Sequence, residues 1–134
     1  MYSDEFSSLT YDTLVKESEA CLKLGKGVIV DATFKDPRQR RQFMDLSSRL
    51  RRPVLFVECR ATEAKTLERL KIRTQRPGEV SDATVSVYMR QREEFVPLSE
   101  IPESMRLIIN TEADTDEAES HVLNSLSRLL SIPE

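Results

Sequence analysis

The sequence predicts an α/β protein with a three-layer arrangement, in which helices cover both faces of a parallel sheet. Apolar runs of strand length alternate with segments whose apolar residues recur about every 3.6 positions. A helix follows each predicted strand, which is the βα pattern of parallel sheets. With 134 residues, of which 39% are apolar and 32% charged, the chain has the size of one domain with its own core. We therefore expect a single domain over residues 1–134.

The amino-terminal part predicts a helix followed by a strand. After a Thr10 cap, apolar residues follow a helical period as far as Leu22. Gly25 closes this helix, because glycine adopts the left-handed conformation common after a helix end. Residues 27–31, Gly-Val-Ile-Val-Asp, then predict a buried strand.

The central part predicts two more helices around a second strand. Asp36 at the cap and Pro37 in the first turn begin a helix that ends before Pro53. Residues 53–59, Pro-Val-Leu-Phe-Val-Glu-Cys, predict a second buried strand. A third helix is expected over about 62–74.

The last part predicts a helical excursion, a strand and a final helix. A Pro-Gly turn at 77–78 separates the third helix from a fourth that opens at Ser81 and Asp82. Two helices with no strand between them suggest an excursion over the sheet, a lid-like pattern. Residues 105–110 predict a third strand, and a helix after residue 117 carries the apolar stripe Val122, Leu126, Leu129 and Leu130.

Composition excludes several classes of protein. No apolar run approaches the roughly 20 residues of a membrane span, and the first ten residues lack the features of a signal peptide. Cys21 and Cys59 have neither metal-ligand nor disulfide-framework spacing, and His121 is the only histidine. His-based metal sites and Ser-His-Asp catalysis are therefore excluded, and no metal ligand is assigned. We expect a cytoplasmic protein with no membrane partner.

The net charge of −3 divides unevenly along the chain. Residues 35–76 contain 13 basic and 5 acidic residues, a net charge of +8, and residues 77–134 carry −8. The basic block is a candidate anion site. Its alternative explanation is a set of solvated helix faces.

Two short signals in residues 25–34, Gly-Lys-Gly-Val-Ile-Val-Asp-Ala-Thr-Phe, are typical of proteins that bind ATP. A phosphate-binding loop needs a strand, then G-x-x-x-x-G-K-[ST], then a helix. Gly25-Lys26 follows a helix, precedes a predicted strand and lacks the Ser or Thr. The pair is therefore a helix end, and the sequence contains no P-loop motif.

Asp31 is the second signal, because it ends a predicted strand at the edge where open α/β sheets bind ligands. A carboxylate in this position handles magnesium or the attacking hydroxyl in P-loop enzymes. A structural cap explains Asp31 equally well, and Thr33 fits a turn hydroxyl. An aspartyl-nucleophile phosphatase is disfavoured, because it needs an acid where Thr33 stands.

Several separated segments carry a resemblance to a known family. The first, over residues 9–43, contains Val-Ile-Val-Asp-Ala-Thr-Phe followed by an arginine nine residues after the Asp; the second, from residue 56, contains Arg-x-x-x-Arg and Ser-Asp-Ala. Together they resemble small ATP-binding P-loop kinases over about residues 9–111. These include the kinase-like domain of bifunctional aminoglycoside phosphotransferase/ATP-binding proteins and, more distantly, polynucleotide and gluconate kinases. The matching positions are Tyr11, Gly27, Asp31, Thr33, Arg40, Arg69, Arg73, Ser81, Asp82 and Gln91.

The resemblance implies a sheet of P-loop kinase type with a helical lid at about 69–92. In the family, a first strand and the P-loop precede the region matched here. We therefore expect a truncated domain, the carboxyl-terminal portion of such a kinase, with the first strand and P-loop absent. A second copy of the chain or the missing amino-terminal segment would then fill the vacated place.

The resemblance also implies roles for individual residues. Asp31 would activate the acceptor or assist magnesium, and Arg40 would hold the acceptor side. Thr33 and Arg38 would contact the substrate. Three arginines of the lid would close over the nucleotide phosphates: Arg69, Arg73 and Arg76. We expect their side chains to lie toward the carboxyl ends of the strands. The alternative for these arginines is a solvated face with salt bridges.

The implied activity is ATP-dependent phosphorylation of a hydroxyl group on a small molecule or a nucleic-acid end. ATP and Mg²⁺ are the cofactors of the parent family, but without the P-loop we expect this chain to bind neither tightly and to have little or no activity. The alternative is a non-catalytic remnant that serves as a binding or assembly module.

Overall fold

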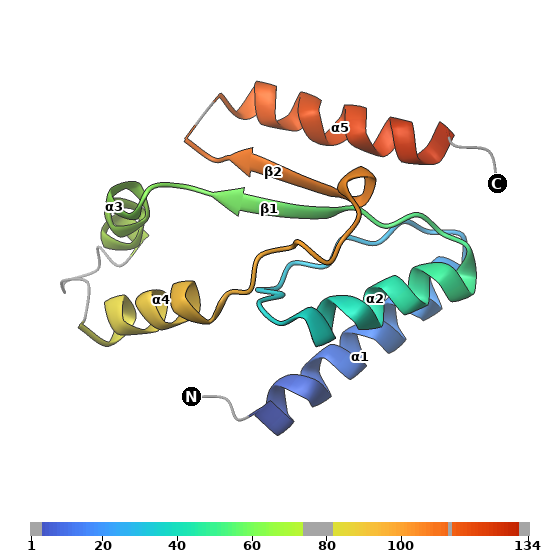
Figure 1. The fold of residues 1–134 in the computed structure, drawn as a ribbon, viewed down its shortest axis with the longest axis horizontal. Helices are drawn as coiled ribbons and strands as arrows, with labels where there is room; N and C mark the ends of the chain where they lie inside the picture. Colours follow the sequence, from blue (N-terminus) through green and yellow to red (C-terminus); the bar gives the residue numbers. More distant parts are fainter. Residues whose placement is uncertain (1–3, 74–81, 113, 132–134) are drawn as a thin grey trace. The chain divides into compact units, whose positions relative to one another are not determined.

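The computed structural model describes residues 4–73, 82–112 and 114–131. They form a mixed α/β fold with a small parallel sheet of two strands and five α-helices in the described part, which confirms the predicted fold class (Figure 1). The chain divides into two compact units, Met1–Val54 and Leu55–Glu134. The division does not test the expectation of a single domain over residues 1–134, which stays a prediction.

The first unit contains two packed helices, α1 (Asp4–Lys23) and α2 (Pro37–Leu50). As predicted, α1 ends before Gly25, which has a positive φ of 82° and donates its N–H to the Leu22 carbonyl at 3.0 Å. Asp36 is the N-cap of α2, also as predicted, and Pro37 follows it. At the other end, Arg51 adopts the left-handed conformation and its N–H bonds to the Ser47 carbonyl.

The predicted strand over residues 27–31 is wrong, because residues 26–31 have no regular secondary structure. Val28 is 37% exposed and Ile29 is 96% exposed. A strand needs a neighbour to pair its backbone groups, and no described strand pairs with this segment. The apolar character of the segment therefore predicted neither its secondary structure nor its burial, because both depend on a neighbouring strand that the local sequence does not supply.

The buried side chains of the first unit come mainly from its two helices. Tyr11 and Ser18 on α1 are buried, as are Phe43 and Leu46 on α2. Phe34, in the connection between the helices, contacts both Tyr11 and Phe43 edge-to-face, with ring centroids 5.2 Å apart in each pair. These aromatic pairs fix the connection against the helices.

The second unit is built on the parallel strands β1 (Phe56–Arg60) and β2 (Arg106–Asn110). Their register pairs Phe56 with Arg106 and Arg60 with Asn110. The helix α5 (Thr115–Ser131) packs along β2, and α3 (Glu63–Arg73) follows β1 (Figure 1). The remaining elements are α4 (Asp82–Glu94) and the short helix η1 (Glu103–Met105).

The boundaries predicted for these elements hold to within a few residues. The second predicted strand begins at Phe56, three residues later than expected, and the third predicted strand and the last helix form where expected. Phe56, Leu98 and Ile101 are buried. No helix in the described ranges is long and apolar enough to cross a membrane.

Candidate anion site and acidic loop

Residues 31–35, which we call the acidic loop after Asp31, lie in the connection between the two helices of the first unit. Asp31 and Thr33 are both exposed. The Thr33 hydroxyl lies 3.4 Å from the hydroxyl of buried Tyr11, and that Tyr11 oxygen also accepts the Phe34 N–H at 3.0 Å. Two predicted site residues therefore stand on a loop that is tied to α1.

Arg40 lies inside the first unit, with none of its surface exposed. Its Nε donates to the Phe34 carbonyl at 2.8 Å, and its Nη2 donates to the Lys35 carbonyl at 3.3 Å. The guanidinium therefore binds the backbone of the acidic loop. Its predicted contact with an acceptor stays a prediction.

Arg38 is exposed and pairs with the N-cap of its own helix. Its Nη2 lies 2.7 Å from Asp36 Oδ2, and its Nε donates to both carboxylate oxygens of Asp36 at 3.2 and 3.1 Å. The side chain is 84% exposed, so this ion pair is surrounded by water and contributes little to stability. Substrate contact by Arg38 stays a prediction.

In the second unit, Arg69 reaches the carboxyl ends of both strands, as expected from the sequence. Its Nη1 donates to Thr111 Oγ1 at 2.8 Å and its Nη2 to the Thr111 carbonyl at 2.7 Å. Thr111 directly follows β2, and its N–H donates to the carbonyl of Arg60, the last residue of β1, at 2.8 Å. Thr111 thus joins Arg69 to the ends of the two strands. We call Arg60, Arg69 and Thr111 the anion site, as a candidate for binding phosphate groups.

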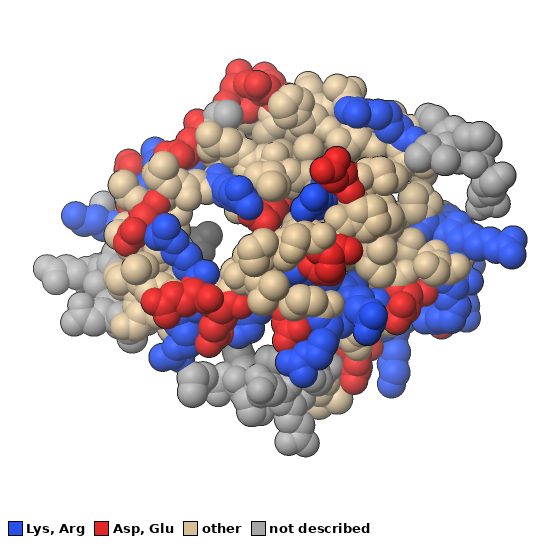
Figure 2. All heavy atoms as spheres, viewed as in Figure 1, with Lys and Arg blue, Asp and Glu red and all other residues tan. Residues whose placement is uncertain are grey.

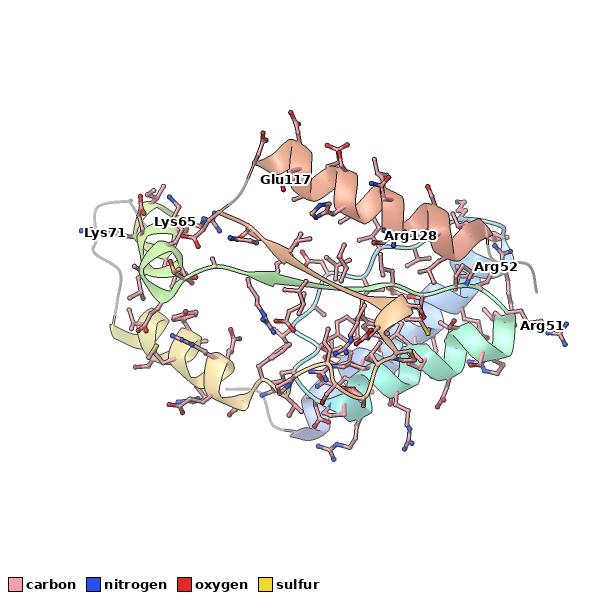
Figure 3. The ribbon with its side chains drawn as sticks, turned by 45° about the horizontal axis from the view of Figure 1, so that its top comes forward. Arg51, Arg52, Lys65, Lys71, Glu117 and Arg128 are labelled. Carbon is pink, nitrogen blue, oxygen red and sulfur yellow. The ribbon has the colours of Figure 1, made fainter. Side chains whose placement is uncertain are left out.

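The other two arginines predicted to bind the nucleotide phosphates are Arg73 and Arg76. Arg73 ends α3, but its side chain lies outside the described residues. Arg76 falls in residues 74–81, which also lie outside them. Lys65 and Lys71 stand on the same helix as Arg69 (Figure 3), and Lys65 pairs with Glu68 of that helix at 3.4 Å.

Acidic side chains at the same edge are bound to neighbouring groups. Glu112 accepts hydrogen bonds from the Thr62 N–H at 3.2 Å and from its hydroxyl at 3.1 Å. Glu63, in the first turn of α3, pairs with Arg92 of α4 at 2.9 Å, and this partner raises the pKa of the Arg92 guanidinium. Basic and acidic side chains are interspersed on the face shown in Figure 2, so no uniform basic surface is seen there.

Sequence reasoning missed Thr111, Arg60 and Glu58. Arg60 pairs through its Nε with Glu58 two residues earlier, and the other carboxylate oxygen of Glu58 is buried with no hydrogen-bond partner among the described residues. Glu58 and Arg60 share a face of β1 through their i, i+2 spacing, but the predicted strand ended at residue 59 and left Arg60 out. Nothing local indicated Thr111, because its role depends on two strands and a helix meeting.

The donor set bears on the cofactors that the sequence resemblance implies. Among the described residues, no group of three or more His, Cys, Asp or Glu side chains could hold a metal ion. Magnesium in nucleotide sites is held by one or two carboxylates together with substrate phosphates. The single exposed carboxylate of Asp31 fits that kind of site. Arg69 uses two of the five guanidinium donors on Thr111, and the others can face an anion.

A shallow hollow of about 250 Å³ lies elsewhere in the second unit, lined by Leu107 of β2 and by four residues of α5. None of the predicted site residues lines it.

Arg69 lies at the carboxyl ends of two parallel strands, which is the edge where open α/β sheets bind their ligands. The comparison with family models agrees: the model described as "AAA domain" matches residues 1–98, well over half of the chain. The chain belongs to this family, a P-loop NTPase-like family of the kinase type. No curated protein and no solved structure matches the chain significantly.

Proposed function

We propose that this chain forms part of an ATP-dependent kinase that phosphorylates a hydroxyl group on a small molecule or a nucleic-acid end. Membership of a nucleotide-binding, kinase-like family supports the reaction class. The more specific likeness to the kinase-like domain of aminoglycoside phosphotransferase/ATP-binding proteins also belongs to this proposal.

The position of Arg69 carries the proposal. Phosphoryl transfer spreads negative charge over the transferred oxygens, and a fixed guanidinium stabilises that charge best when its position is set beforehand. Thr111 holds Arg69 through two hydrogen bonds and is itself bound to the end of β1. Arg69 is therefore fixed at the strand ends and keeps further donors for phosphate oxygens. Arg73 and Arg76 would add donors from the same part of the chain.

The acceptor half of the proposal rests on Asp31. Its carboxylate stands on a loop tied to both helices of the first unit and is exposed to solvent. It is assigned to accept the hydroxyl proton of the acceptor or to assist the magnesium ion of the nucleotide. Thr33 and Arg38, exposed on or beside the same loop, are assigned to the acceptor.

A second candidate function follows from the missing motif. The 134 residues contain no G-x-x-x-x-G-K-[ST] sequence, so the backbone cradle for the β- and γ-phosphates has no counterpart in them. A non-catalytic binding or assembly module would not need that cradle.

A titration with Mg·ATP tests the proposed function. Because Arg69 acts without a backbone cradle, we expect a dissociation constant no tighter than about 1 mM, with amide NMR shifts centred on Thr111 and α3. Arg69→Gln removes the guanidinium. It should raise the dissociation constant about tenfold, as the loss of a charge-assisted contact does.

Arg41→Gln is the matched control, because Arg41 is an exposed arginine on α2 that the proposal does not use. It should leave the titration unchanged. If saturating nucleotide moves no amide near Thr111, the kinase proposal is wrong and the module is favoured. A micromolar dissociation constant would instead show that another phosphate site exists.

A further inference from the structure

Two buried side chains hold the backbone of the acidic loop from opposite helices. Tyr11 comes from α1 and Arg40 from α2. The Tyr11 hydroxyl accepts the Phe34 N–H at 3.0 Å, and Arg40 donates to the carbonyls of Phe34 and Lys35 at 2.8 and 3.3 Å. Both polar groups of the Phe34 backbone are therefore bound by side chains.

The burial of Arg40 makes this arrangement costly unless the loop takes one conformation. A guanidinium removed from water loses several kcal/mol of hydration unless hydrogen bonds replace it. Arg40 is fully buried, and loop carbonyls supply those bonds. Any movement of the loop would leave a buried charge without these acceptors, so Arg40 penalises other loop conformations.

Phe34 shows that the loop is held in a conformation it would not choose alone. Its φ is +44°, in the left-handed region that non-glycine residues avoid at a cost of about 1–2 kcal/mol. Such a conformation persists only when the surroundings determine it from several sides. Here Tyr11 binds the N–H, Arg40 binds the carbonyl, and the Phe34 ring packs between Tyr11 and Phe43.

We propose that Tyr11 and Arg40 are positioning residues, which fix the acidic loop and thereby set where Asp31 stands. The functional meaning rests on the proposed role of Asp31, since a proton acceptor must be held within a fraction of an ångström of its working position. Arg40 acts through the loop backbone and does not touch the acceptor. The acceptor contact expected for Arg40 from the sequence is the alternative to this role.

Amide NMR with hydrogen exchange on the whole chain tests the proposal. Arg40→Met removes the donors while keeping an apolar stem, and Tyr11→Phe removes only the hydroxyl and keeps the ring contacts. We expect each change to speed exchange of the Phe34 amide at least about fivefold relative to the amides of Phe43 and Leu46. The amide and carboxyl resonances of Asp31 should move in both variants.

Three further variants separate positioning from general stabilisation. Leu46→Ala destabilises α2 through its core, and it should speed all these amides together without moving the Asp31 resonances. Arg41→Met removes an exposed arginine next in sequence and should change neither. Arg40→Lys keeps one donor group and should restore part of the Phe34 protection.

The proposal is overturned if Arg40→Met or Tyr11→Phe behaves as Leu46→Ala does, with a uniform loss of protection and unmoved Asp31 resonances. If Arg40→Met fails to fold, Tyr11→Phe and Arg40→Lys still decide the matter, because each leaves the core nearly intact. None of these measurements uses nucleotide. A failed Mg·ATP titration would therefore contradict the proposed function and leave this test as it stands.

Discussion

Asp36 caps the amino-terminal end of α2 through hydrogen bonds of both its side chain and its backbone N–H. Its Oδ1 accepts the Arg38 N–H at 2.8 Å, and its own N–H donates to Gln39 Oε1 at 3.3 Å. These reciprocal bonds satisfy backbone groups that the first turn of a helix leaves unpaired. The hydrogen bonds from the Arg38 side chain and backbone hold the pKa of Asp36 below its ordinary value of 3.8.

The sign of the resulting pH effect follows from that lowered pKa. The ionised carboxylate is favoured in the folded chain, so its contribution to stability is fully present well above pH 3.8. It is lost as the pH falls below 3.8 and through the folded pKa. We expect Asp36→Ala to lower the free energy of unfolding at pH 7 by about 1 kcal/mol, as loss of an N-cap does.

Urea unfolding at pH 7 and pH 3 of the wild type, Asp36→Ala and Asp36→Asn measures this effect. Asparagine caps helices as well as aspartate does, so Asp36→Asn should cost at most about 0.5 kcal/mol at pH 7. Its difference from the wild type should shrink at pH 3. Asp45→Asn, an exposed change on the same helix, serves as control. Equal losses for the Ala and Asn variants would contradict a capping role.

At the scale of single elements, residues 26–31 show where local pattern stops being sufficient. Helices contain their own backbone partners, and the five described α-helices were predicted near their observed positions. The predicted Thr10 cap is wrong, because α1 begins at Asp4 and Thr10 lies within it. β1 and β2 also formed, because each provides the other's partner. Residues 26–31 have the same apolar character but no described strand beside them.

This difference predicts how substitutions in the segment behave. Ile29→Lys should change the free energy of unfolding by less than about 0.5 kcal/mol at low protein concentration, because its side chain is 96% exposed. Phe43→Ala, in the core of the same unit, should cost about 3 kcal/mol. Chemical denaturation compares them. A loss above 2 kcal/mol for Ile29→Lys, on the order of a core truncation, would show that the segment is buried in solution.

At the scale of the whole molecule, the chain comprises two compact units and leaves large apolar side chains in contact with water. In the first unit, Leu9, Leu24 and Ile29 are exposed by 63%, 74% and 96%. Exposed apolar side chains and unpaired strand-forming segments commonly mark surfaces that bind other chains. These exposed side chains are consistent with the expectation that a second copy of the chain is the partner.

We therefore predict that the isolated chain self-associates as a dimer. Light scattering should give about twice the chain mass of 15.4 kDa, falling toward the single mass on dilution. Ile29→Lys should favour the monomer, whereas Ile29→Val, which keeps the apolar character, should not. A cooperatively folding monomer at every concentration would rule out this dimer.

The anion site and the acidic loop differ in how far they could be foreseen. Arg69 was expected to lie toward the strand ends because the resemblance to P-loop kinases assigns it to the arginines that close over the nucleotide phosphates. Thr111 was not, since its hydrogen bonds to Arg69 and Arg60 join residues far apart in sequence. Arg40 was singled out as functional, but its burial could not be read from a stretch rich in exposed arginines.

The sequence by itself determined the α/β class, the helix ends at Gly25 and Asp36, and the family to which the chain belongs. These depend on backbone conformations and periodicities that neighbouring residues set locally. The tertiary structure alone decided that residues 26–31 join no strand among the described residues, that Arg40 binds a loop backbone, and that Thr111 anchors Arg69. Each of these depends on a partner distant in sequence, because a hydrogen bond or a buried charge acquires its energy only where the folded chain places the other group.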